Sequence, residues 1–184
     1  MPPALESPWL EFLTELDSLL TEDHQFHCIG GFAVITAYGL PRSSNDLDYY
    51  SMTPADKAAE LEQIAGEGSE LHKRHKVFVH NAAVATLPEN YDERLAEVFA
   101  GQFRHIRLFV PDPYDLILSK LSRNIQRDRE DAKYIVQTCK LKAEVLEARY
   151  HEEMQVCLIG PPERHENTLR FWLEDFFPHD SETH

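Results

Sequence analysis

Two aspartates separated by one residue, Asp46 and Asp48, have the types and spacing to do chemistry. They lie in the alternating polar and apolar run Asp46–Tyr50, which predicts a strand with both carboxylates on one face. Adjacent carboxylates repel each other, so a hard divalent cation such as Mg²⁺ (or Mn²⁺) is favoured between them. The spacing therefore predicts a metal site, with Asp46 and Asp48 as its ligands and as the catalytic residues.

A glycine pair, Gly30 and Gly31, precedes the aspartates in the chain. It follows a predicted strand at residues 25–29 and leads into a predicted helix, Phe32 to Tyr38. Adjacent glycines let a phosphate approach backbone N–H groups, and the start of a helix favours an anion. Arg42, which lies between that helix and the aspartates, could reach a triphosphate. These positions predict a phosphate-binding turn beside the metal site.

The glycine pair followed by the run Arg42-Ser43-Ser44-Asn45-Asp46-Leu47-Asp48 resembles the signature of the nucleotidyltransferase superfamily, which has the DNA polymerase β-like fold. It is similar to the branch that contains abortive-infection and toxin–antitoxin nucleotidyltransferases. A second match lies downstream, where Lys120-Leu121-Ser122-Arg123 and then Arg127-Asp128-Arg129-Glu130-Asp131 resemble the helical K-x-x-R … R-D-x-x-D motif of those toxins. The two matches stand in the order of the family and together span most of the chain.

The resemblance implies a Mg²⁺-dependent enzyme that moves a nucleoside monophosphate from a nucleoside triphosphate to a hydroxyl of RNA or protein. It also implies a toxin with a cognate antitoxin as partner. Lys120 and Arg123 would bind phosphates, and Asp131 would orient them or contact the nucleotide. The residues expected to bind nucleotide are Gly30, Gly31, Arg42, Ser43, Ser44, Lys120, Arg123 and Asp131.

The sequence departs from the family pattern in one place. A third carboxylate usually comes from a neighbouring strand, but the strand or hairpin predicted at residues 76–87 contains neither Asp nor Glu. His80, Glu89 and Asp92 are the nearby substitutes. An alternative hypothesis is therefore a catalytically weak or inactive protein of the same fold that binds a nucleotide or a partner. A purely structural interaction module that uses the aromatic C-terminal helix is a third.

Structural interpretations remain open beside these functional ones. Asp46 and Asp48 would also suit an exposed sheet edge, and Gly30 and Gly31 a tight strand-to-helix turn. Lys120, Arg123 and Arg127 would also suit helix-surface ion pairs, with Glu130 and Asp131 as the available acids. The basic run at residues 72–76 is expected to be a solvated turn rather than an RNA or zinc site.

The composition limits the classes of partner. The formal net charge of the 184 residues is -14, which argues against non-specific binding of duplex DNA, because phosphate neutralisation drives that binding. The three cysteines are widely spaced, and a reducing cytoplasm is the expected location. We expect neither a signal peptide nor a membrane-spanning segment.

The periodicity along the chain predicts an α+β fold, a small mixed β-sheet core flanked by helices and followed by a helical portion. The core is expected at residues 1–112 and the helical portion at residues 113–184. Other elements are predicted as follows: a helix from Trp9 to Leu20 capped by Ser7, a helix from Pro54 to Ile64, a short helix from Tyr91 to Phe99, a strand from His105 to Val110, and helices at 114–125, 128–138, 142–154 and 163–177.

Overall fold

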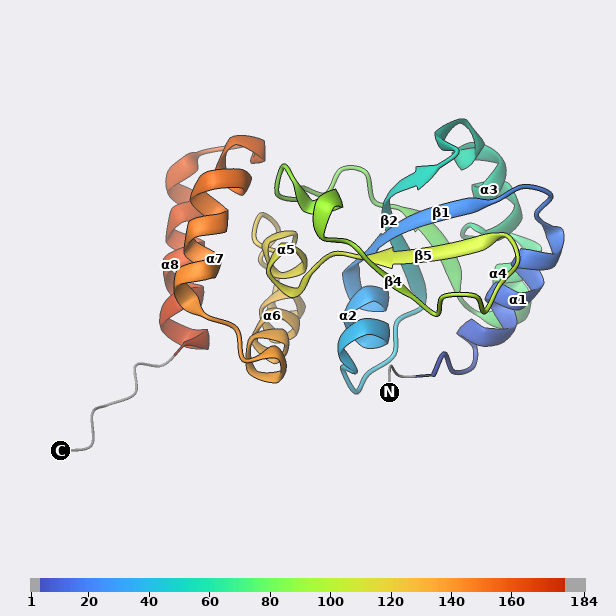
Figure 1. Ribbon diagram of the computed structural model, residues 1–184, viewed down its shortest axis with the longest axis horizontal. Helices are drawn as coiled ribbons and strands as arrows, with labels where there is room; N and C mark the ends of the chain where they lie inside the picture. Colours follow the sequence, from blue (N-terminus) through green and yellow to red (C-terminus); the bar gives the residue numbers. More distant parts are fainter. Residues whose placement is uncertain (1–3, 178–184) are drawn as a thin grey trace. The chain divides into compact units, whose positions relative to one another are not determined.

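The computed structural model describes residues 4–177 of the chain. Two compact units are present. The first holds the chain up to Ala85 together with Asp92–Asp112, and the second holds Thr86–Tyr91 together with the chain from Pro113 onward. The fold is mixed α and β, as predicted, with the sheet in the first unit and helices in both (Figure 1). Within the described range, no helix has both the length and the apolar character needed to cross a membrane.

A five-stranded mixed sheet is the frame of the first unit, with its strands in the order β3-β2-β1-β5-β4. The central strand β1 pairs antiparallel with β2 and parallel with β5, while β3 adds parallel to β2 and β4 antiparallel to β5. The backbone groups of β1 are thus paired on both sides. The strands are β1 His24–Ile29, β2 Asp46–Thr53, β3 Phe78–Asn81, β4 Ala96–Val98 and β5 Ile106–Val110.

The first half of β2 follows the alternation predicted from its sequence. Leu47 and Tyr49 point into the core and are 1% and 2% exposed. Asp46 and Asp48, on the opposite face, are half-buried. The two carboxylates therefore share one face of the sheet, because successive side chains of a strand point to opposite sides.

A β-bulge interrupts the pairing of β1 with β2. Cys28 pairs with Tyr49, whereas the residue before Cys28 pairs with Ser51, so Tyr50 is an extra residue on β2. Such an insertion shifts the alternation of a strand by one position. As a result, Met52 as well as Tyr49 is buried, although the two are three residues apart.

Helix α1 buries the apolar face that its spacing predicts, but it begins differently. Pro8, not Ser7, occupies the N-cap position, and no side chain caps the helix. Ser7 lies one residue too early to reach the first turn's N–H groups, and its hydroxyl donates instead to Glu11 Oε1 at 2.5 Å. The helices of the first unit are α1 Trp9–Leu19, α2 Gly30–Tyr38, α3 Ala58–Ala65, which follows the 3-10 turn Ala55–Lys57, and α4 Glu70–His75.

Most of the basic run at residues 72–76 is helix α4 rather than a solvated turn, so that prediction is wrong. Ser69 caps the helix, since its Oγ accepts the N–H of His72 at 3.1 Å. The basic side chains fall in the last turn, where the partial negative charge of a helix end favours cations. Lys76 ends the helix in a left-handed conformation, with φ at 64°. Helices α1 and α4 lie side by side (Figure 1).

Two more predicted segments differ in the structure. Of the strand or hairpin expected at 76–87, only Phe78–Asn81 is a strand. The helix expected from Tyr91 to Phe99 is instead a 3-10 turn, Tyr91–Arg94, followed by strand β4. Pairing of β4 with β5 determines this outcome, because contacts with a neighbouring strand outweigh weak local preference.

The second unit is helical after Pro113, as predicted, but its first helix is shorter than expected. That helix ends at Leu118, and the chain then turns until Asn124, which has a φ of 46°. Asparagine tolerates this left-handed conformation better than most residues. The helices are α5 Pro113–Leu118, α6 Gln126–Cys139, α7 Ala143–Arg149 with a π-helical turn Tyr150–Met154 and a 3-10 turn Gln155–Cys157, and α8 Pro162–Phe176.

The aromatic residues of α8 form part of the core of the second unit. Trp172 and Phe176 are 0% and 3% exposed, and their rings are 5.3 Å apart. The indole N–H of Trp172 donates to Asn124 Oδ1 at 3.0 Å, so the polar atom of the buried ring is satisfied. Phe171 is 54% exposed. The aromatic run of this helix therefore serves mainly in packing.

Candidate functional site

Strand β1 ends beside the acidic pair. Its last residue, Ile29, pairs with Asp48 on β2, and Gly30 follows with a φ of 68°. A β-carbon at Gly30 would collide with Oδ2 of Asp48 and would lie 3.2 Å from the Asp48 Cβ. Glycine is therefore required at this position for two reasons, the left-handed backbone and the close approach of the carboxylate.

The second glycine makes room for the loop that precedes the acidic pair. A β-carbon at Gly31 would lie 3.0 Å from Ser44 Oγ and 3.2 Å from each of the two terminal nitrogens of Arg42. Glycine at this position lets both polar side chains lie against the start of α2. The loop side chains and the glycine turn are thus brought together, as the sequence predicts.

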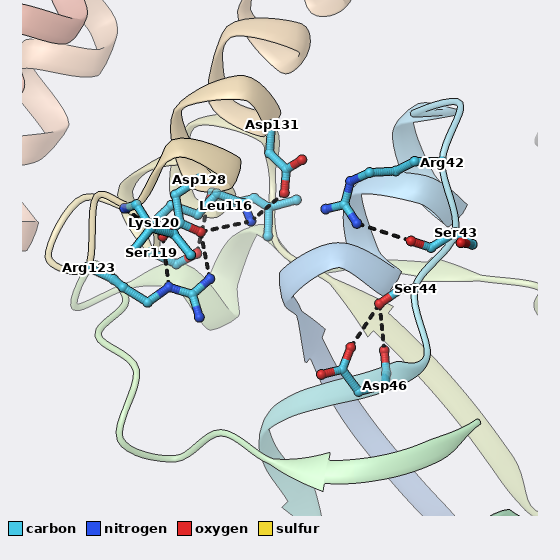
Figure 2. Close-up of polar contacts among 11 residues, drawn as sticks. Arg42, Ser43, Ser44, Asp46, Leu116, Ser119, Lys120, Arg123, Asp128 and Asp131 are labelled. Atoms are coloured by element: carbon cyan, nitrogen blue, oxygen red, sulfur yellow. Dashed lines mark hydrogen bonds and ion pairs between the residues drawn. The ribbon is translucent and has the colours of Figure 1, made fainter. Parts of the chain in front are cut away.

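Ser44 connects this turn to the first aspartate. Its Oγ lies 2.9 Å from Oδ1 of Asp46 and 3.1 Å from the carbonyl oxygen of Asp46 (Figure 2). Arg42 donates from one terminal nitrogen to the carbonyl oxygen of Ser43 at 3.2 Å. Asp48 meets the glycine turn directly, and Asp46 meets it through Ser44. Both carboxylates therefore face the turn.

The glycines begin helix α2 instead of preceding it. Ile29 is the N-cap residue, and no side chain caps this helix end. The first N–H groups of a helix have no partner within the helix, and the helix dipole places partial positive charge there. The start of α2, beside Asp48, thus combines backbone donors with a field that favours phosphate oxygens.

His80 is the substitute for a third acid that the structure brings to this site. Strand β3 pairs parallel with β2 so that His80 stands beside Asp48, and His80 Nδ1 lies 2.7 Å from Asp48 Oδ1. Of the other two substitutes, Asp92 acts electrostatically on His27 of β1, and Glu89 belongs to the second unit.

The donor set suits a cation that also takes ligands from a substrate. Among residues 4–177, no three His, Cys, Asp or Glu side chains are grouped so that they could hold a metal ion by themselves. Mg²⁺ commonly uses one or two carboxylates and completes its shell with water and phosphate oxygens. Asp46 and Asp48, on one face beside a phosphate-binding turn, fit that kind of site.

A buried thiol lies behind the acidic pair. Cys28 is 0% exposed, and its Sγ is 3.9 Å from the carbonyl oxygen of Phe26. Burial raises the pKa of the Cys28 thiol far above its ordinary value, and the negative charge of Asp48 raises it further. The thiol therefore stays protonated and is a packing group rather than a ligand or a nucleophile.

A hollow of about 620 Å³ borders the same loop. Arg42, Ser43 and Ser44 form one wall, while Trp9 and Ile35 contribute apolar surface from α1 and α2. The hollow thus combines apolar walls with polar groups from the loop that carries Ser44 to Asp46. A small organic group attached to a phosphate would find both kinds of contact here.

The predicted basic residues of the second unit form ion pairs with acids of α6. Lys120 is 5% exposed, and its Nζ donates to Asp131 Oδ2 at 2.9 Å, with Asp128 Oδ1 at 3.8 Å (Figure 2). Asp128 and Asp131 are 0% and 2% exposed. The ammonium and both carboxylates are therefore desolvated together, and their mutual pairing offsets the cost of that burial.

Arg123 extends the same cluster to the surface. Its guanidinium binds Asp128 through two parallel hydrogen bonds, 2.8 Å from Nε to Oδ2 and 2.6 Å from a terminal nitrogen to Oδ1. Oδ2 of Asp128 also accepts the N–H of Ile125 at 3.3 Å, so Asp128 also stabilises the start of α6. The Arg123 side chain is 65% exposed, so it is accessible from solvent.

A mixed sheet with a glycine turn, a pair of acids on the next strand and a following helical unit defines a nucleotidyltransferase-like protein. Comparison with protein families agrees. The model of the family described as "Nucleotidyltransferase of unknown function (DUF6036)" matches residues 10–179, and the chain belongs to that family. No curated protein and no solved structure matches the chain.

Proposed function

We propose that this protein transfers a nucleoside monophosphate from a nucleoside triphosphate to a hydroxyl of RNA or protein. The observation that carries the proposal is that Asp46 and Asp48 both face the turn at Gly30 and Gly31. This arrangement sets two carboxylates beside an uncapped helix start. A cation and a polyphosphate are the ligands that satisfy both features.

Asp46 and Asp48 would hold Mg²⁺ or Mn²⁺. The bound cation would neutralise the charge that develops on the phosphates during transfer. The backbone N–H groups at the start of α2 bind phosphate oxygens, and Arg42 adds a charged donor against Gly31. Ser44 keeps Asp46 turned toward the cation through its 2.9 Å hydrogen bond. The apolar walls of the neighbouring hollow suit the base of the nucleotide.

In the second unit, we assign Lys120 and Asp131 a structural role, because their ion pair is buried. Arg123 has an exposed side chain and is the member of this cluster that we expect to bind phosphate. Its fork of donors is already oriented by Asp128. This assignment follows the order of the two motifs in the chain and the geometry of the cluster.

Transfer of a radiolabel tests the proposal. The protein is incubated with each α-³²P-labelled nucleoside triphosphate, Mg²⁺, and either total RNA or a cell lysate, and the acceptor is separated by electrophoresis. We expect labelling by the wild type and none by Asp46→Asn or Asp48→Asn. Asp175→Asn, which changes an exposed acid of α8, is the matched control. Labelling that persists in both site variants would exclude the proposed site.

A second function, binding of a nucleotide without turnover, is favoured by one observation. The described residues offer the cation two acids instead of a group of three ligands. Calorimetry with Mg²⁺ and nucleoside triphosphates separates the two functions when it is paired with a measurement of pyrophosphate release. Binding with release supports the enzyme, and binding without release supports the second function.

We further propose that the protein is a toxin that acts in the cytoplasm, where nucleoside triphosphates and Mg²⁺ are available. A cognate antitoxin would inhibit it. Support for this extension comes from the resemblance of the two motifs to the toxin branch. Expression of the wild type should then arrest growth of its host cells, and expression of Asp46→Asn should not. Equal growth with both proteins would contradict the toxin role.

A further inference from the structure

His80 and Asp48 form a hydrogen-bonded pair at the edge of the acidic site. They are neighbours in the parallel pairing of β3 with β2, and His80 Nδ1 lies 2.7 Å from Asp48 Oδ1. The His80 side chain is 53% exposed, whereas that of Asp48 is 23% exposed. The imidazole is thus the more exposed member of the pair and is accessible from solvent.

The pairing determines which ring nitrogen is available. A carboxylate accepts hydrogen bonds, so the nitrogen that faces Asp48, Nδ1, carries the proton. In the neutral ring, the proton on Nδ1 leaves Nε2 with a lone pair. Within residues 4–177, no hydrogen-bond partner of His80 Nε2 is found. A carboxylate that orients a histidine in this way prepares the second nitrogen to accept a proton.

The two carboxylate oxygens of Asp48 make different contacts. Oδ1 receives the hydrogen bond from His80, and Oδ2 lies against Gly30 at the glycine turn. The oxygen near the turn remains directed to the side where the phosphates and the cation would bind. One carboxylate therefore links the phosphate-binding turn to a histidine at the solvent edge.

We propose that His80 is the general base of the transfer reaction and that Asp48 orients it. This inference rests on the proposed function. His80 Nε2 takes the proton of the acceptor hydroxyl while the hydroxyl oxygen forms a bond to the α-phosphorus. The bond from the α-phosphorus to the bridging oxygen breaks, and pyrophosphate leaves with that electron pair. The imidazolium then releases its proton to water, to which its ring is exposed.

Three variants separate a base from a group that only positions Asp48. His80→Asn places an amide N–H near the position of Nδ1, so it keeps a donor to Asp48 but has no lone pair to act as base. His80→Ala removes both features and leaves space for added imidazole. His105→Asn is the matched control, because His105 forms the same kind of pair, 3.0 Å from Nδ1 to Asp23 Oδ1, at the other end of the sheet.

The experiment measures the rate of label transfer from the α-³²P-labelled triphosphate that the wild type uses best, together with calorimetric binding of that triphosphate with Mg²⁺. We expect kcat to fall about 10²- to 10⁴-fold in both His80 variants, with unchanged binding in His80→Asn, which keeps the donor to Asp48. Added imidazole should restore part of the rate to His80→Ala and should not affect the other variants. His105→Asn should match the wild type.

Each contrary result has a definite meaning. Wild-type rates in His80→Asn would overturn the base role and leave His80 as a group that positions Asp48. Loss of triphosphate binding in His80→Asn would overturn it in favour of a ligand role. Failure of imidazole to raise the rate of His80→Ala also counts against it. If the wild type transfers no label, the proposed function fails, and the inference fails with it.

Discussion

The ammonium of Lys120 donates to the carboxylate of Asp131 at 2.9 Å, and both side chains are buried in the second unit. Loss of one member of a buried ion pair leaves the other charge in a poorly solvated place. We therefore expect Asp131→Ala to lower the free energy of unfolding by about 3–5 kcal/mol, as measured by urea denaturation. The remaining acid, Asp128, is 3.8 Å from the ammonium and compensates only in part.

The ion pair of Lys133 with Asp175 provides the control for that measurement. Its atoms are 3.2 Å apart, but its side chains are 42% and 45% exposed. Because water solvates exposed charges well, Asp175→Ala should cost only about 0–1 kcal/mol. Equal losses of stability in Asp131→Ala and Asp175→Ala would show that burial does not distinguish the two pairs.

Gly30→Ala is expected to damage the acidic site as well as the fold. The left-handed backbone alone should cost about 1–2 kcal/mol for a residue with a β-carbon, and the added carbon would also displace the Asp48 carboxylate. Gly101→Ala isolates the first effect, since Gly101 has a φ of 75° and, apart from its own atoms and its chain neighbours, no heavy atom lies within 4 Å of the added carbon. Both variants should lose stability, but only Gly30→Ala should lose calorimetric binding of Mg²⁺ and triphosphate.

Ser44→Ala should weaken binding of the cation without unfolding the protein. The substitution removes the hydroxyl that lies 2.9 Å from Asp46 Oδ1 and so releases that carboxylate from its orientation. Groups that orient a metal ligand typically contribute about 10- to 100-fold in affinity. We expect a loss of that size in a Mn²⁺ titration followed by electron paramagnetic resonance. Ser18→Ala, which removes an exposed hydroxyl on α1, should bind like the wild type, and an unchanged affinity in Ser44→Ala would contradict the assignment.

The three cysteines should react with iodoacetamide at different rates. Cys28 is fully buried, and burial raises the pKa of its thiol, so the reactive thiolate is scarce and shielded. Cys139 and Cys157 are partly exposed and should be modified first, although burial also raises the pKa of each. Peptide mass spectrometry measures the order. In urea all three should react alike, and equally fast modification of Cys28 in the native protein would contradict the buried position.

The orientation of the acidic pair could be predicted from the sequence because it depends on local geometry. Alternation along β2 places Leu47 and Tyr49 in the core and the two acids opposite them. The glycine turn was predictable for the same reason, since a strand and a helix meet there within a few residues. Helix α1 and strand β5 were also visible in their apolar spacing.

Pairing between distant segments was not predictable in the same way. His80 stands beside Asp48 only because β3 joins the sheet parallel to β2, and nothing in residues 76–87 indicates that register. Strand β4, of three residues, shows too little alternation to be distinguished from a helix. The capped start of α4 at Ser69 is masked in the sequence by the basic residues that follow it, since such residues favour an exposed turn equally well.

The loop from Thr86 to Tyr91 belongs to the second unit, although the residues on both sides of it belong to the first. Within that unit, the N–H of Glu89 donates to the carbonyl oxygen of Glu153 at 3.2 Å. The polypeptide therefore crosses between the units three times. A fragment that begins at Pro113 would lack this segment, so the helical portion cannot be excised intact by cutting the gene once. Gene fusion or shuffling that treats it as a removable C-terminal module would leave an incomplete module.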